Sequence, residues 1–183
     1  MQVIETDIQG PRILLPDKIG DQRGFFSEVY SRKMLVSAGI AVDFIQDNHS
    51  LSVQKNVVRG MHYQIPPMAQ DKLVRVVRGS ILDIVVDVRK NSPTFGKHVA
   101  VVLSAENWKQ IFVPVGFGHG FITLEPNTEV LYKVSREYSP GNERAFRWND
   151  PELKIDWGVD ESKVILSPRD RTHPMFGDLK DLF

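Results

Sequence analysis

The sequence has no cysteine, no excess of either charge and no long apolar run. The lack of cysteine among 183 residues excludes disulfides, cysteine-held clusters and thiol nucleophiles, and is typical of a reducing compartment. Lys plus Arg equals Asp plus Glu at 23 each, so no net positive field holds nucleic acid or an anionic membrane. No stretch approaches the roughly 18 apolar residues of a membrane helix, and residues 1–7 do not resemble a signal peptide. We therefore expect a cytoplasmic protein that binds any anionic ligand through local contacts.

Short apolar segments separated by turn residues fill most of the chain. Residues 81–89 alternate apolar and charged side chains, the period-two pattern of a half-buried strand. Gly79-Ser80 separates them from residues 72–78, and we predict that the two segments form a hairpin. Residues 31–38 predict a short helix, with Ser31 as N-cap and Gly39 just after its end. Many short strands with one early helix favour an antiparallel sandwich or barrel, built as one domain over residues 1–183.

Residues 58–64 predict an apolar strand that carries Arg59 and His62. A histidine in such a place can be a base, a metal ligand or a buried polar residue. Because Arg59 and His62 are three residues apart, a regular strand sends them to opposite faces. The family resemblance described below implies that both side chains serve one site, and we expect Gly60 to permit the bulge or twist that this requires.

Two passages resemble the motifs of the cupin barrels. Pro114-x-Gly116-x-x-His119 resembles the second motif, and Gly60-x-His62 lies where the first would be. The resemblance implies a mainly β fold: a cupin-type antiparallel barrel or jelly roll with a few short helices, its core at about residues 40–140. N-terminal strands and a C-terminal tail of loops and helical turns would surround that core. Metal cupins have a second histidine where Gln64 stands and a nearby glutamate, so we expect no metal here.

A longer set of motifs, collinear from about Pro11 to Asp170, is similar to the dTDP-4-dehydrorhamnose 3,5-epimerases. These motifs are Arg23-Gly24-Phe25-Phe26-x-Glu28, residues 44–50, Arg59 to Gln64, Lys72 to Arg75, Asp83 to Arg89, Ser92 to Gly96, Leu103 to Asn107, Val113 to Phe121, Tyr132-Lys133 and Trp148 to Pro151. The resemblance implies epimerisation of dTDP-4-dehydro-6-deoxy-D-glucose at C3 and C5, without a metal or other cofactor. The product, dTDP-4-dehydro-L-rhamnose, would lead to dTDP-L-rhamnose.

The chemistry of such a reaction explains the residue types. Both carbons flank the C4 ketone, so a base can remove the proton if the enolate oxygen is stabilised and an acid returns a proton from the opposite face. The resemblance implies His62 as the base, Asp170 as the acceptor that fixes its tautomer, and Tyr132 as the acid. Lys72 would supply positive charge to the enolate, and His119 would lie beside the sugar.

The remaining matched positions imply a nucleotide and sugar site. Arginine forks suit diphosphate oxygens, and Tyr138 is expected to stack on the thymine ring or to be a surface or interface aromatic. Many relatives have lysine where Arg169 stands, which keeps the charge. The implied contact residues are Arg23, Glu28, Gln46, Asp47, Asn48, Arg59, Lys72, His119, Tyr138, Glu143 and Arg169.

The resemblance also implies a homodimer with exchanged N-terminal strands, so that Arg23 and Glu28 serve either their own site or the neighbour's. Three other functions stay open at this point. The chain could be an epimerase acting at C5 or C3 only, a metal-dependent cupin oxygenase or isomerase, or a sugar-binding module without activity.

Overall fold

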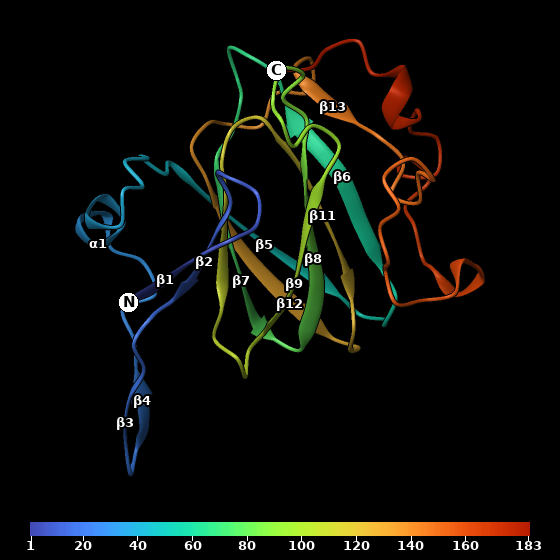
Figure 1. The fold of residues 1–183 in the computed structure, drawn as a ribbon. Helices are drawn as coiled ribbons and strands as arrows, with labels where there is room; N and C mark the ends of the chain where they lie inside the picture. The colour runs from blue at the N-terminus through green and yellow to red at the C-terminus, as the bar shows by residue number, and fades with distance from the viewer.

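Two antiparallel sheets form the body of the protein in a computed structural model of residues 1–183 (Figure 1). The six-stranded sheet contains, in spatial order, β1 (Gln2–Glu5), β2 (Arg12–Leu15), β10 (Gln110–Val113), β7 (Lys72–Arg78), β12 (Thr128–Val134) and β5 (Gln46–Ser52). The five-stranded sheet contains β13 (Glu143–Ala145), β6 (Val58–Gln64), β11 (Phe117–Thr123), β8 (Ser80–Asp87) and β9 (His98–Ser104). The predicted mainly β, antiparallel architecture is confirmed.

The remaining elements lie outside these sheets. They are the hairpin β3 (Ile19–Asp21) and β4 (Gly24–Phe26), helix α1 (Arg32–Ser37), and two 3₁₀ turns, η1 (Glu161–Lys163) and η2 (Phe176–Asp178). The predicted helix is confirmed, since Ser31 is its N-cap and Gly39 follows its end with a positive φ of 74°, although the Ser31 side chain makes no capping hydrogen bond. The structure contains no helix with the length and apolarity needed to span a membrane.

The predicted hairpin of residues 72–78 and 81–89 is wrong. β7 pairs with β10 and β12, whereas β8 pairs with β11 and β9 in the other sheet. At Gly79 the backbone has a φ of 74°, and a Cβ there would lie 2.4 Å from Oγ1 of Thr128, so only glycine fits. The chain crosses at this glycine from one sheet to the other, which a pattern of turn residues cannot distinguish from a hairpin.

The prediction that β8 is half-buried is also wrong, because both of its faces are covered. Ile84 and Val86 pack in an apolar cluster with residues of the C-terminal tail, including Trp148, while Val85 packs in the cluster between the sheets. The charged face points the same way as Val85, and Asp83 and Asp87 are 0% exposed. Carboxylates on an inward-facing surface give the barrel a polar interior.

Candidate active site

A cavity of about 330 Å³ opens between the two sheets. Its lining residues are Ser50, Arg59, His62, Lys72, His119, Phe121, Tyr132, Ser167, Arg169 and Asp170. A neighbouring hollow of about 500 Å³ shares four of these residues and extends the site along β5 and β13. Its further lining residues include Gln46, Asn48, Tyr138 and Glu143. Most of the side chains predicted from the motifs therefore gather in one elongated site.

The predicted irregularity at Gly60 is present. In the pairing of β6 with β11, His62 faces His119 and Arg59 faces Phe121, so three steps on β6 match two on β11. Gly60 has a φ of 138°, and a Cβ there would lie 2.5 Å from Cα of Gly120. This close approach of the two strands requires glycine and lets Arg59 and His62 line the same cavity.

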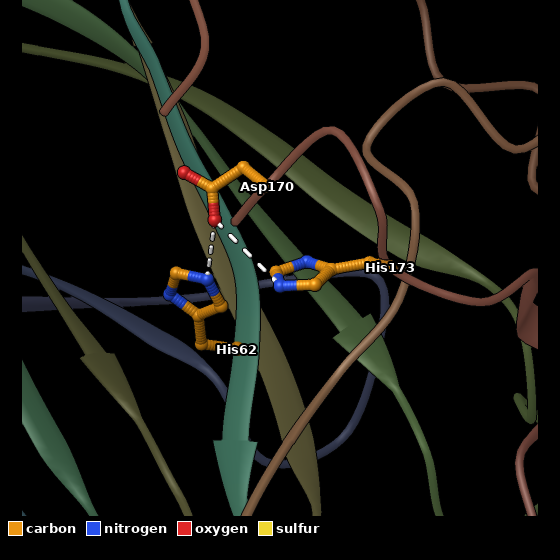
Figure 2. Close-up of side chains that lie close together, drawn as sticks. All are labelled: His62, Asp170 and His173. Atoms are coloured by element: carbon orange, nitrogen blue, oxygen red, sulfur yellow. Dashed lines mark hydrogen bonds and ion pairs between the residues drawn. The ribbon is translucent and has the colours of Figure 1, made fainter. Parts of the chain in front are cut away.

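His62 and Asp170 form the pair that the resemblance implied (Figure 2). His62 Nε2 lies 2.8 Å from Asp170 Oδ1, and Ser167 Oγ donates to Oδ2 at 2.9 Å. Burial alone would raise the pKa of Asp170, but the hydrogen bonds from His62 and Ser167 outweigh burial and lower it. An ionised carboxylate only accepts, so Nε2 carries the ring proton of neutral His62 and Nδ1 keeps a free lone pair. The arrangement makes Nδ1 the atom that can take a proton.

His173 lies against this pair and was not found from the sequence. Its ring packs edge-on to that of His62, with centroids 5.4 Å apart, and its Nε2 lies 3.9 Å from Asp170 Oδ1. Burial and the neighbouring His62 lower the pKa of His173, which favours its neutral form. His173 follows the last strand in an irregular segment, where no periodic pattern signals which side chains converge. Ser167 was not predicted from the sequence for the same reason, because it also lies in an irregular segment.

Tyr132 and Lys72 line the cavity from the sheet opposite to His62. Burial raises the pKa of Tyr132, so the phenol keeps its proton at neutral pH. Burial lowers the pKa of Lys72 to about 8, against the attraction of Asp83 and Glu143. At pH 7 the cavity therefore presents a neutral phenol and a cationic amine on the wall facing the histidine.

His119 lines the cavity but is bound to a second carboxylate. Its Nε2 lies 3.0 and 2.9 Å from the two oxygens of Asp83, and the two side chains are 8% and 0% exposed. Burial raises the pKa of Asp83, although His119 and Lys72 both oppose that shift. The sequence placed Asp83 on the polar face of its strand without a partner, because the pairing depends on the register of β8 against β11.

The polar residues expected at the nucleotide end lie beside one another. Gln46 Nε2 donates to Asn48 Oδ1 at 2.8 Å, and the Tyr138 hydroxyl donates to Glu143 Oε2 at 2.9 Å. Arg169 forms an ion pair with that same carboxylate. Tyr138 is 53% exposed, so its ring is open to a stacking partner.

Three predicted contact residues do not reach this cavity. Asp47 points to the opposite face of β5 from its two neighbours and forms an ion pair with Lys133 at 2.7 Å, because successive strand residues alternate. Glu28 lines a separate hollow near α1. Arg23 lies at the tip of the β3–β4 hairpin, which projects away from the body (Figure 1). Within one chain these three residues lie outside the cavity, so their contact with a ligand stays a prediction, and for Arg23 and Glu28 it requires the site of a neighbouring chain.

Fold and site together define a class of protein. The chain is a jelly-roll barrel with a polar cavity in which a carboxylate-bound histidine faces a neutral tyrosine and a lysine, an arrangement suited to proton transfer at a carbon atom next to a carbonyl.

Comparison with known proteins gives the family. The model of the dTDP-4-dehydrorhamnose 3,5-epimerases matches residues 5–178. An epimerase of this name from Shigella flexneri is 47% identical over 179 residues, which cover 97% of each chain. The crystal structure of one from Bacillus anthracis with bound TDP and pyrophosphate has a TM-score of 0.93 at 46% identity, covering 96% of this chain and 99% of that one.

A third relative was solved with a sugar nucleotide. The epimerase from Legionella pneumophila, in complex with dTDP-4-keto-L-rhamnose, has a TM-score of 0.93 at 42% identity, covering 98% of this chain and 94% of that one. This chain belongs to the dTDP-4-dehydrorhamnose 3,5-epimerase family. The predictions of a cupin-type fold and of an isomerase are confirmed.

Proposed function

We propose that the protein converts dTDP-4-dehydro-6-deoxy-D-glucose into dTDP-4-dehydro-L-rhamnose by inversion at C3 and C5, in the cytoplasm and on the way to dTDP-L-rhamnose. The observation that carries this proposal is the placement of His62 and Tyr132 on opposite sheets of one cavity. Inversion at carbon requires a base on one face of the ring and a proton donor on the other.

The proposal gives each group a role that its position supports. His62 removes the proton next to the C4 ketone through Nδ1, and Asp170 stabilises the imidazolium that forms, because its carboxylate holds Nε2–H. The cationic Lys72 stabilises the enolate oxygen. Tyr132 then donates its phenolic proton to the carbon from the opposite face. No step requires a metal or a nicotinamide.

The outer part of the site would hold the nucleotide. Arg59 and Arg169 line the cavity and offer guanidinium forks to the diphosphate, while Gln46 and Asn48 present amides to the base or sugar. Tyr138 is the aromatic ring available to stack on thymine.

A second copy of the chain would complete the site. β1 and β2 pair within their own sheet through β10, which leaves the β3–β4 hairpin as the element able to cross to a partner. That hairpin carries Ile19, Phe25 and Phe26 at 68%, 55% and 66% exposure, as well as Arg23 at its tip. Exposed apolar side chains that lie close together favour burial against a partner chain. We propose a homodimer in which Arg23 reaches the neighbour's cavity.

Deuterium exchange tests the proposed reaction. The protein is incubated with dTDP-4-dehydro-6-deoxyglucose in deuterated water containing EDTA, and C3 and C5 are followed by NMR. Deuterium at both carbons supports the proposal, deuterium at one carbon indicates an epimerase for that carbon only, and exchange at neither carbon indicates a binding module. Activity that returns only with added metal would indicate a metal-dependent enzyme. His62→Ala should lower exchange by roughly 10²–10⁴-fold, whereas His98→Ala on β9, outside the cavity, should not.

Mixed dimers test the shared site. Arg23→Ala and His62→Ala are each expected to be weakly active alone. If Arg23 serves the neighbour, a hybrid dimer of the two variants has one intact site and regains up to half of the wild-type activity. A hybrid no more active than its parents would place Arg23 at its own chain's site or outside catalysis.

A further inference from the structure

His173 has unused binding capacity beside the catalytic pair. Its side chain is 8% exposed, yet neither Nδ1 nor Nε2 has a hydrogen-bond partner. Buried polar atoms in proteins are normally paired. Figure 2 shows one Asp170 oxygen with contacts to the rings of both His62 and His173, so the unpaired imidazole and the catalytic histidine approach the same carboxylate oxygen.

We propose that His62, Asp170 and His173 form an inhibitory binding site for a divalent transition-metal ion such as Zn²⁺. The three side chains each offer a ligand atom, and these atoms all lie within 4.8 Å of one another. Two imidazole nitrogens and a carboxylate oxygen are a donor set that zinc prefers, with water as a fourth ligand.

The distances suit such an ion after small movements. Ligand atoms of a tetrahedral zinc ion lie roughly 3.4 Å apart, given metal–ligand bonds of about 2.0–2.1 Å. In the structure Asp170 Oδ1 lies 2.8 Å from His62 Nε2 and 3.9 Å from His173 Nε2, one distance shorter and one longer than zinc requires. His62 and Asp170 line the substrate cavity but His173 does not, so we place the ion on the His173 side of the pair, away from the sugar.

Zinc at this position would switch the tautomer of His62. The metal bonds to Nε2 and displaces the proton that Nε2 donates to Asp170. The neutral ring keeps one proton, which now resides on Nδ1 after exchange through water. Nδ1 loses the lone pair that accepts the substrate proton, so the base becomes a donor. This tautomer switch, which rests on the proposed function, predicts inhibition by zinc that extra substrate does not relieve.

Direct zinc binding tests the site without any assay of activity. The wild-type full-length protein competes for Zn²⁺ with a chromophoric chelator, beside His173→Ala, His173→Gln and the control His98→Ala. We expect one zinc ion per wild-type and control chain, bound at least tenfold more weakly by both His173 variants. Equal zinc affinity of wild type and folded His173→Gln, or no binding by wild type, would overturn the proposal.

Activity and NMR then test the mechanism. Zinc should inhibit epimerisation at saturating substrate, EDTA should restore the rate, and His173→Gln should need at least tenfold more zinc for the same fractional inhibition. Long-range ¹H–¹⁵N spectra should show the His62 proton move from Nε2 to Nδ1 on zinc addition. Inhibition relieved by substrate, or an unchanged tautomer, would overturn the mechanism. Zinc binding without any epimerase activity would refute the proposed function and leave the metal site standing.

Discussion

The charge of Lys72 is required for the proposed reaction but lowers the stability of the folded protein, and both effects can be measured. Its ammonium group lies in the wall of the cavity, where burial lowers its pKa from 10.5 to about 8 even with Asp83 and Glu143 attracting it. We predict that Lys72→Met makes the folded protein more stable at pH 7 while abolishing epimerisation. Methionine keeps the length of the side chain and removes the charge.

The magnitude follows from the pKa. The folded protein binds the lysine proton less tightly than the unfolded chain, and each pKa unit corresponds to about 1.36 kcal/mol. A fall from 10.5 to about 8 therefore costs the folded state roughly 3 kcal/mol whenever the amine is charged in both states. The cost is complete below pH 8, shrinks as the pH rises from 8 to 10.5, and is absent above that window. The wild type should thus approach the variant in stability as the pH rises.

Urea unfolding followed by tryptophan fluorescence gives the comparison. Protein concentration is held constant, because association would add to the apparent stability. The variant should be more stable by about 3 kcal/mol at pH 7 and by less than half as much at pH 9.5. Lys97→Met, at an exposed position, should change little at either pH. A Lys72→Met protein as stable as wild type at pH 7, or a difference independent of pH, would refute the reasoning.

Four further predictions concern the same cavity. The wild-type turnover rate should fall above pH 8, because Lys72 is protonated below its pKa of about 8 and neutral above it, and a pH–rate profile measures this. Tyr132→Phe should retain deuterium exchange at C5 better than inversion there, since the base remains and the acid does not; equal loss would contradict the assigned roles. His119→Ala leaves Asp83 buried and unpaired, so urea unfolding should show a loss of roughly 3–5 kcal/mol. Gly60→Ala should give little folded protein by circular dichroism, because its Cβ would lie 2.5 Å from the Gly120 backbone.

The fold class could be predicted because short segments of period two, separated by turn residues, leave few alternatives to an antiparallel barrel. The pairing of strands could not. Gly79-Ser80 is a turn signal whether the chain folds back in one sheet or crosses to the other, and only contacts such as that of Gly79 with Thr128 decide. The alternation in β8 was likewise correct as a pattern and incorrect as a sign of exposure, because the C-terminal tail covers its apolar face.

The residues of the site also fall into a group that the sequence predicts and a group that it does not. His62, Tyr132 and Lys72 lie on strands, where spacing and motif locate a side chain on one face. Ser167 and His173 lie in an irregular segment more than a hundred residues after β6, and their approach to His62 depends on the path of the tail. Arg23 lies apart from the cavity of its own chain because it is on the β3–β4 hairpin. No property of that sequence segment shows whether Arg23 serves its own chain or a neighbouring one.

The two histidines of the cupin-type motifs have different surroundings in this barrel, although each is bound to a carboxylate. His62 and His119 face one another on β6 and β11, yet each is bound to its own carboxylate. The His62 side chain is 29% exposed to the cavity, so it can exchange a proton with a ligand, whereas His119 and its partner are nearly sealed. Gln64, at the place of a metal cupin's second histidine, donates to the carbonyl oxygens of Met68 and Glu137 and accepts from the amide of Ser139. A side chain bonded to two loops in this way anchors the end of β6, so the position that would bind metal in other cupins here holds the strand that carries His62.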